Sequence, residues 1–227
     1  MKNLLSLEDL TGWFNDTKLI LLDSRICINN ASRLKEGTKQ EELKTAENQI
    51  KRNFGFFNIH WYQCKFISVI QLNKLFSQSK SQKRSFKKLF GKLKGQKYDD
   101  QLMELLRSNS SRTGNSFKTK KDILLAIEHC ESEIKKQQDT IDGIEKLRNK
   151  VYAHTDPEND EAKNVVLAKT VDLEELAESI WNHMNGGFFG SQHIFHHTIE
   201  WDLGGIIETV AMDHQAKLEA LEAKMKG

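Results

Sequence analysis

The stretch that decides the fold runs from residue 119 to residue 154 and reads TKKDILLAIEHCESEIKKQQDTIDGIEKLRNKVYAH. Its apolar positions recur at alternating steps of four and three, which is the spacing of one face of an α-helix. They are Ile123, Ile127, Cys130, Ile134, Ile141, Ile144 and Val151. Gln137 and Arg148 occupy two further steps of this apolar seam, where aliphatic residues are expected. The pattern predicts one long helix that ends near Thr155, because the residue before Pro157 is pushed out of the helical region.

The rest of the chain is also predicted to be helical. Pro157 is the single proline of the sequence, and so few helix breakers permit long helices. Further helices are expected over residues 7–34, 39–77, 83–94, 98–107, 172–185 and 203–225. Ser6 and Asp172 are placed to cap two of them. Polar or glycine-rich composition predicts a mobile loop at 108–118 and another loop at 185–190. The fold class expected from these patterns is all-α.

Composition favours a soluble, globular, cytoplasmic protein. Hydrophobic residues make up 38% of the chain and charged residues 29%, which is the balance of a folded domain rather than of a disordered one. No window approaches the roughly 18 apolar residues that cross a bilayer. Acidic Glu8 and Asp9 argue against a secretory signal at the N-terminus. Cys27, Cys64 and Cys130 are odd in number and widely spaced, so reduced thiols are expected.

The small net charge of +2 conceals a strong asymmetry. Residues 1–121 carry 24 Lys and Arg against 11 Asp and Glu, whereas residues 122–227 carry 10 against 21. Residues 48–98 contain twelve basic residues, no acidic residue and many interleaved aromatics. Such a block is typical of a surface that binds a polyanion. The alternative is that the aromatics form the core and the lysines form the solvated side of ordinary helices.

Arg148 and His154 form a candidate catalytic pair. An arginine in an apolar seam is costly to bury unless it meets an anion, and a histidine titrates near neutral pH. Such a pair suits RNA cleavage without a metal, with the histidine moving protons and the arginine stabilising the phosphate. One histidine cannot comfortably perform both proton transfers at once, whereas a symmetric dimer supplies two. The alternative is an ordinary helix C-terminus, with Arg148 in an ion pair.

Residues 147–156, LRNKVYAHTD, resemble the signature of the HEPN superfamily, in which an arginine is followed after four to six residues by a histidine. The full string is similar to the abortive-infection AbiU-type branch. The resemblance implies an antiparallel four-helix core with additional C-terminal helices, usually in a homodimer. It also implies a metal-independent endoribonuclease of the phage-defence or toxin type. Arg148 and His154 would be the active pair, Asn149 the polar assistant and Asp156 a candidate orienter of His154.

The resemblance covers residues 1–185, and residues 186–227 are expected to form a C-terminal loop and helix packed on the same domain. It calls for no metal and no cofactor. The expected partners are RNA, a second copy of the chain and an antitoxin or other defence-system protein, with no membrane. Predicted RNA contacts are Lys83, Arg84, Lys87, Lys88 and Lys150. In HEPN toxins silenced by nucleotidylation, the modified tyrosine lies two residues after the histidine. Asp156 stands there in this chain, so that form of control is not expected.

A non-catalytic module that binds nucleic acid or a nucleotide is the competing hypothesis. The nuclease predicts that Arg148 and His154 face a basic cleft near residues 48–98. The binding module predicts that an internal carboxylate satisfies Arg148 and that His154 is enclosed. A second cluster, His193, His196 and His197 with His183 nearby, has a spacing that could bind a metal ion on a helical turn. The neighbouring aromatics favour a packed aromatic patch there.

Overall fold

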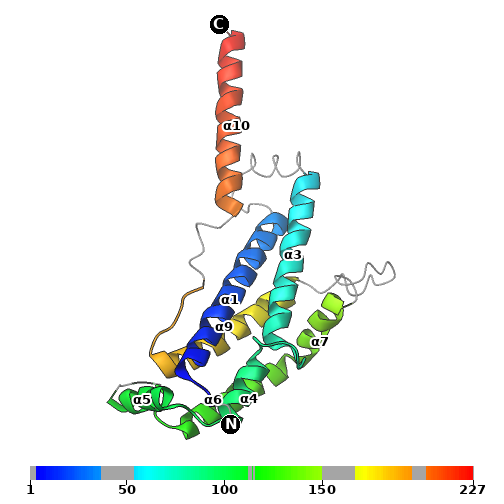
Figure 1. Cartoon of the computed structure of the whole chain (residues 1–227). Helices are drawn as coiled ribbons and strands as arrows, with labels where there is room; N and C mark the ends of the chain where they lie inside the picture. The colour runs from blue at the N-terminus through cyan, green and yellow to red at the C-terminus, as the bar shows by residue number, and fades with distance from the viewer. Residues whose placement is uncertain are drawn as a thin grey trace.

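The computed structural model describes residues 4–36, 54–111, 114, 116–149, 167–195 and 203–226. Its helices are α1 (Leu7–Glu36), α3 (Phe54–Phe76), α4 (Phe86–Gly95), α5 (Asp100–Ser108), the 3₁₀ turn η2 (Asn109–Ser111), α6 (Lys120–Lys136), α7 (Gln138–Leu147), α9 (Leu167–Phe189) and α10 (Leu203–Lys226). α1 packs along α3 and α9, α6 contacts α9, and α7 contacts both α3 and α9 (Figure 1). The predicted all-α bundle is confirmed, with α6 and α7 together supplying one of its four sides.

Side-chain caps fix where two of the helices begin. The backbone N–H of Asp9 donates to Ser6 Oγ at 3.0 Å, as the sequence predicts. At the start of α6, Thr119 Oγ1 accepts from the N–H of Asp122 at 3.3 Å, and Asp122 Oδ2 accepts from the N–H of Thr119 at 2.8 Å. The Lys118 N–H also donates to Asp122, and this hydrogen bond is the main reason that the pKa of Asp122 is lowered. The capping box therefore places α6 in the register that buries Ile123.

The predicted single helix over residues 119–154 is wrong, because it is broken at Gln137. The backbone there leaves the helical region, with φ −102° and ψ 14°, and α7 starts afresh at Gln138. A straight helix drifts by about 20° per heptad from a strict four-three pattern. A break midway lets Ile127 of α6 and Ile141 of α7 both reach the core, where each is buried. Residues 150–154 lie outside the described part of the chain.

The core lies between the long helices and is closed by aromatic side chains. Its largest fully buried members are Phe86, Phe90, Phe188, Phe195, Leu5, Leu10, Leu21 and Leu72. Trp181 of α9 reaches across to α1, where its Nε1–H lies 3.1 Å from Thr17 Oγ1 and 3.3 Å from the carbonyl oxygen of Phe14. The indole therefore buries apolar surface without leaving its N–H unsatisfied. This contact joins the first helix to the last helix of the bundle.

A buried ion pair also joins α1 to α9. Arg25 Nη2 lies 2.6 Å from Glu174 Oε2 and 2.8 Å from Glu178 Oε2, and the side chains of Arg25 and Glu174 are 5% and 0% exposed. Glu178 accepts a hydrogen bond from Arg25, whereas no described residue donates one to either Glu174 oxygen. Burial is the main reason that the pKa of Glu174 rises from 4.5 to about 8, although Arg25 opposes the rise. A protonated Glu174 leaves one cation and one anion in the cluster.

α9 is longer at both ends than the sequence predicts. It begins at Leu167, so Asp172 lies inside the helix rather than at its cap. It continues to Phe189, which corrects the loop expected at 185–190. Gly190, with φ +67°, terminates the helix, and its N–H donates to the carbonyl oxygen of Gly186 at 2.8 Å. Phe188 is fully buried, so packing overrides the low helix propensity of the two glycines before it.

The segment predicted as a mobile loop at 108–118 is anchored at both ends. Asn109 Nδ2 donates to the carbonyl oxygens of Phe117 at 3.2 Å and Phe188 at 2.9 Å. The Phe117 N–H donates to the Gly187 carbonyl oxygen at 2.6 Å, and its ring packs edge-on to Phe188. A Cβ on Gly187 would overlap the Phe117 ring, so this position favours glycine. The composition of the loop hid both anchors, because Asn109 and Phe117 are single residues in a polar run.

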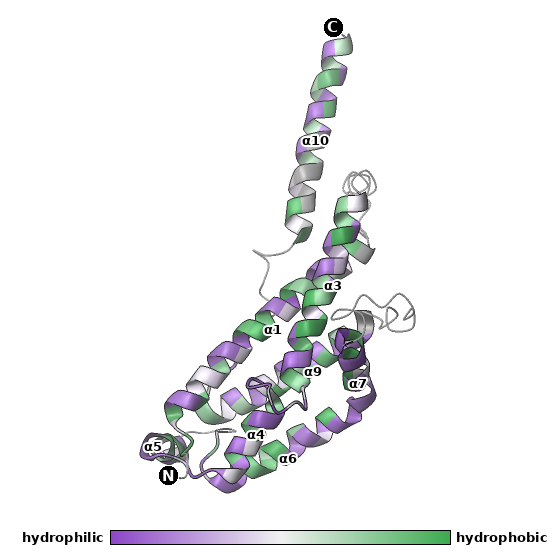
Figure 2. Cartoon of the chain, turned by 45° about the vertical axis from the view of Figure 1, so that its right-hand side comes forward, coloured by the Kyte–Doolittle hydropathy of each residue, from purple (hydrophilic) through white to green (hydrophobic). Residues whose placement is uncertain are grey.

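α10 confirms the helix predicted over 203–225 and projects away from the bundle (Figure 1). The Leu203 N–H donates to Asn30 Oδ1 at 2.9 Å, which ties its start to α1. Figure 2 shows hydrophobic and hydrophilic positions alternating along it, and Leu221 and Met225 are exposed. None of the described helices has an apolar stretch of the length and purity needed to cross a bilayer.

We expect Glu174→Gln to remove a pH dependence of stability. The raised pKa means that the folded chain holds this proton up to about pH 8, while the unfolded chain releases it near 4.5. Wild-type stability should therefore fall as pH rises between these values, by the order of 4 kcal/mol, since one pKa unit corresponds to about 1.4 kcal/mol. Urea unfolding from pH 5 to 8.5 measures this. Glu128→Gln, at an exposed position of α6 outside the cluster, is the control and should retain the slope; an equal slope in wild type and Glu174→Gln would contradict the assignment.

Gly187→Ala should destabilise the fold by about 1–3 kcal/mol, the usual cost of overpacking, because the new Cβ would overlap the Phe117 ring. Gly186→Ala is the control, since its Cβ would make only ordinary contacts, the nearest at 3.6 Å. Both glycines lie within the same helix, so the change in propensity is shared. Thermal unfolding of the two variants should differ by several degrees. Equal melting temperatures would show that Phe117 has room to move.

Candidate active site

Arg148 and Asn149 follow directly on α7, at the end of the helix that contacts both α3 and α9. Arg148 keeps a helical backbone, with φ −59° and ψ −46°, and its N–H donates to the carbonyl oxygens of Ile144 and Glu145. Ile144 and Leu147 anchor this turn in the core. Arg148 Nη1 donates to Asn149 Oδ1 at 3.0 Å. The structure therefore brings the arginine and its predicted polar assistant together at the protein surface.

The prediction that Arg148 lies in the buried seam is wrong. Arg148 is exposed, as is Asn149, while the seam positions Ile141 and Ile144 before it are buried. The seam ends with α7, so Arg148 falls just beyond the packed part. In the part of the chain that the structure describes, no carboxylate forms an ion pair with it. An internal carboxylate on Arg148 was the expectation of the non-catalytic alternative, and it is not met among these residues.

Three of the predicted site residues lie outside the described residues. They are His154 and Asp156 of the motif and Lys150 of the predicted RNA contacts. The geometry of the site therefore rests on Arg148, Asn149 and the surfaces around α7.

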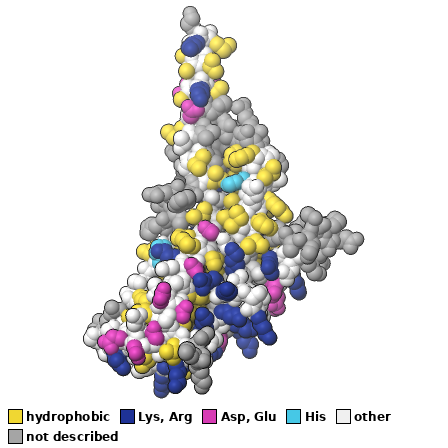
Figure 3. Space-filling model, viewed as in Figure 1, with side chains coloured by type: hydrophobic (Ala, Val, Ile, Leu, Met, Phe, Trp, Pro, Cys, Tyr) yellow, Lys and Arg dark blue, Asp and Glu magenta, His cyan; other side chains and the backbone are white. Residues whose placement is uncertain are grey.

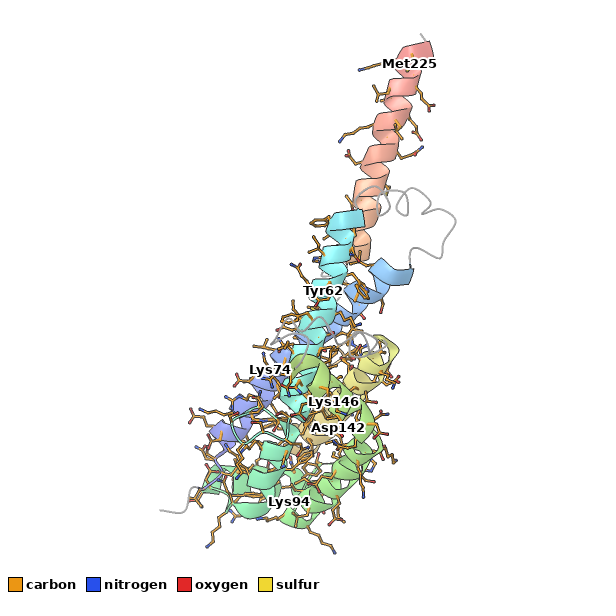
Figure 4. All side chains as sticks on the ribbon, turned by 90° about the vertical axis from the view of Figure 1, so that its right-hand side faces the viewer. Tyr62, Lys74, Lys94, Asp142, Lys146 and Met225 are labelled. Carbon is orange, nitrogen blue, oxygen red and sulfur yellow. The ribbon has the colours of Figure 1, made fainter. Side chains whose placement is uncertain are left out.

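The predicted RNA contacts on and before α4 form a separate basic surface. Lys83 and Lys87 are exposed, Lys88 is half-buried, and Arg84 forms an ion pair with Asp16 of α1. Figure 3 shows Lys and Arg side chains gathered where α4 and the lower end of α3 lie in Figure 1. In Figure 4, Lys94 of α4 lies at the lower end of the molecule, with Asp142 and Lys146 of α7 above it. The basic surface thus lies toward the opposite end of α7 from Arg148 (Figure 4), so the described residues do not form the basic cleft at Arg148 that the nuclease hypothesis predicted.

A hollow of about 250 Å³ lies between the end of α3, α4 and the junction of α6 and α7. Its lining is apolar at Leu75, Phe76, Phe86, Phe90 and Ile134 and polar at Gln78, Lys87, Glu131, Lys135 and Gln138. It therefore includes Lys87 from the basic surface and Gln138, the first residue of α7. Arg148 follows Gln138 by ten residues, or about 15 Å of helix rise.

Among the described histidines, His193 belongs to an aromatic patch, and His183 and His129 form a surface pair. The His193 ring lies 4.6 Å from that of Phe195 and 6.4 Å from that of Trp181, and its backbone is held by Asn182. His183 instead faces His129 of α6 at 5.8 Å. Burial, followed by the charge of His129, lowers the pKa of His183. No group of three metal-ligating side chains gathers within the described ranges, and His196 and His197 lie outside them.

Sequence reasoning missed the arginine that is truly buried. Arg25 continues an apolar series in α1 at Leu21 and Ile28, spaced by four and three residues. We argued for Arg148 that an arginine in an apolar seam needs an anion. That argument holds for Arg25, which contacts Glu174 and Glu178 of α9. The sequence signal was present in the spacing. A glutamate inside the otherwise apolar side of α9 was the second half of that signal.

The surface at the end of α7 can bind an anion. The Arg148 guanidinium has five N–H donors, of which the structure uses one for Asn149. The remaining donors suit two oxygens of one phosphate, and the Asn149 contact restricts the side chain to fewer rotamers. A charged group at the surface that is oriented by a neutral amide keeps its full charge for a ligand.

Comparison with known families places the chain beside one family. A family model described as AbiU2, and named HEPN_AbiU2, matches residues 20–203, which is most of the chain and includes the segment 147–156. No match was found among curated proteins or among solved structures.

Arg148→Ala should leave stability within about 0.5 kcal/mol of wild type, as is usual at an exposed position. Arg25→Ala should cost about 3–5 kcal/mol, because it removes the cation that faces the buried Glu174 and the partly buried Glu178. Urea unfolding of both variants measures the contrast. A large loss of stability in Arg148→Ala would mean that this arginine supports the fold, and its placement at a surface site would then be wrong.

Proposed function

The chain belongs to the AbiU2 family of the HEPN superfamily, and from this premise we propose that it is a metal-independent endoribonuclease of abortive-infection type. The match confirms the resemblance carried by residues 147–156. Arg148 and His154 are the proposed catalytic pair, with Asn149 as assistant and Asp156 as orienter of the histidine. The substrate is RNA, because the chemistry requires a ribose 2′-hydroxyl.

The exposure of Arg148 is the observation that supports this proposal most. A structural arginine at the end of a helix would be expected to fold back onto a carboxylate of its own chain. Here Nη1 is held by Asn149, and among the described residues no carboxylate neutralises the guanidinium. Its charge is therefore available to a phosphate of the substrate. The basic surface at the other end of α7 supplies a path for the remaining backbone of the RNA.

In the proposed reaction the 2′-oxygen attacks the adjacent phosphorus. One imidazole takes the 2′-hydroxyl proton as the O2′–P bond forms, and an imidazolium gives a proton to the 5′-oxygen as the P–O5′ bond breaks. Arg148 holds the non-bridging oxygens and stabilises the added negative charge of the transition state. The products are a 2′,3′-cyclic phosphate and a 5′-hydroxyl. No water is consumed in this step.

The two proton transfers favour a homodimer. His154 of one copy cannot comfortably take one proton and give another in the same step, whereas two copies supply two imidazoles. We place the enzyme in the cytoplasm, where its three free thiols stay reduced. A nuclease of this kind has to be kept silent in a healthy cell, so an antitoxin or another defence-system protein is its expected partner.

The test is cleavage of a mixed RNA pool in the presence of EDTA. Wild type should cut and leave cyclic phosphate ends, and His154→Ala should lose about 10²–10⁴-fold in rate, the usual contribution of a general acid or base. Arg148→Ala should lose about 10²–10³-fold by analogy with the loss of one transition-state donor. Arg148→Lys should recover part of the rate, since lysine retains the charge without the fork of donors.

Two surface residues serve as matched controls. His129→Ala removes an exposed histidine of α6, and Arg107→Ala removes an exposed arginine that pairs with Glu104 on α5. Both should cut RNA at the wild-type rate. If wild type does not cut, or if His154→Ala cuts equally well, the nuclease is refuted and a non-catalytic binding module becomes the better account. Dimer formation is checked separately by sedimentation.

A further inference from the structure

The hollow between α3, α4 and the α6–α7 junction has the composition of a base-binding site. Three of its lining residues are phenylalanines that are at most 4% exposed and form its apolar floor, with ring centroids 5.4 Å apart for Phe76 and Phe86 and 6.2 Å apart for Phe86 and Phe90. At about 250 Å³ it is smaller than the roughly 300–1,000 Å³ of pockets that enclose drug-sized ligands. An aromatic, polar-rimmed hollow of this size suits one flat heterocycle rather than a larger ligand.

Cations at the rim point to a phosphate beside that heterocycle. Lys87 of α4 and Lys135 of α6 line the hollow from different helices, and both are exposed. Neither forms an ion pair with another described residue. The acid at the rim, Glu131, is already occupied, because Lys94 Nζ lies 2.7 Å from each of its oxygens. The uncompensated charge of the rim is therefore positive.

Two amides complete the rim. Gln138 Nε2 donates to Asp142 Oδ1 at 2.6 Å, which fixes the amide and leaves its oxygen as an acceptor. Gln78, on the opposite side, is exposed and offers both a donor and an acceptor. An amide that donates and accepts matches the N6 and N7 edge of adenine.

We propose that this hollow binds one unpaired adenine nucleotide of the RNA substrate and fixes where the strand is cut. The inference rests on the proposed nuclease and deepens it. Arg148 lies about 15 Å along α7 from Gln138, or roughly four stacked nucleotides at about 3.4 Å each. The base in the hollow would therefore hold the strand in a register that presents a phosphate several nucleotides away to the Arg148 end of α7.

Binding is measured first with adenosine 5′-monophosphate and with a labelled 12-nucleotide RNA, by calorimetry and fluorescence anisotropy on the full chain carrying His154→Ala. Lys135→Ala should weaken binding about tenfold, the loss of one charge-assisted contact. Ile134→Trp, which fills the hollow without changing charge, should weaken it at least as much. Lys136→Ala is the matched control, because Lys136 is the next residue of α6 and pairs with Glu133 instead of lining the hollow. It should change binding less than about twofold.

Register is measured with the cleavage-competent chain on oligouridylate strands that contain one adenosine at a varied position. The cut should move with the adenosine in wild type, and in Ile134→Trp the positions of the remaining cuts should no longer follow the adenosine. Circular dichroism checks that each variant is folded.

The outcomes separate the two proposals. If the hollow variants weaken binding of both the monophosphate and the strand, the hollow binds a free nucleotide. If they weaken binding of the strand alone, the hollow binds a nucleotide only within RNA. If both hollow variants bind like Lys136→Ala, the site is refuted, whether or not RNA is cut. If the position of the cut does not depend on the position of the adenosine, the claim that the hollow fixes where the strand is cut is refuted. If binding responds but wild type never cuts RNA, the nuclease fails and the nucleotide site stands.

Discussion

The guanidinium of Arg25 is the contact on which the arrangement of the bundle depends. It joins α1 to α9 in the middle of the core, where it meets Glu174 and Glu178. Two carboxylates around one cation would leave a net negative charge in a medium of low dielectric constant, and such a charge is costly. The raised pKa of Glu174 resolves the imbalance, because a protonated Glu174 beside an ionised Glu178 makes the cluster neutral. An ion pair of this kind fixes the register of two helices more strictly than apolar packing does.

The consequence of that register extends to both ends of α9. Trp181 lies two turns beyond Glu174 and reaches Thr17 on α1, so the same helix pair is fixed at a second point. Phe188 follows after another two turns, and Phe117 packs against it over Gly187. The polar segment before α6 is thereby attached to α9, and α6 and α7 are positioned in turn. The turn that carries Arg148 thus owes its place to contacts that begin at Arg25.

Periodicity and caps predicted most of the helices, and tertiary contacts decided the rest. Ser6 starts α1 as its sequence indicates, and α10 lies over the residues predicted for the last helix. The failures share one cause, since a local pattern does not reveal the partner of a residue. The composition of residues 185–190 predicts a loop, and only the burial of Phe188 explains why they are helical. Two arginines stand at seam positions, and only the structure distinguishes Arg25, which has an acidic partner, from Arg148, which the seam no longer covers.

The candidate site was predictable in composition and less so in arrangement. The Arg–Asn–x4–His string nominates the residues from sequence alone, and the AbiU2 match supports the family that the string resembles. What sequence could not supply was the separation between the motif and the basic surface on α4. A block of basic residues in the sequence does not show toward which part of the molecule their helix directs the side chains. The contact of α4 with α6, rather than with the end of α7, settles that direction.

The break at Gln137 connects these observations. A continuous helix over 119–154 would have no N-terminus at residue 138 and would carry its hydrogen-bond ladder past the hollow without interruption. The break instead turns Gln138 and Lys135 toward Phe76, Phe86 and Phe90. It also makes α7 a separate, rigid spacer of ten residues with the hollow at one end and Arg148 at the other. A polar residue that weakens the seam costs packing in the core, and the geometry obtained in exchange is a fixed distance between the two surfaces that we propose hold the nucleic-acid strand.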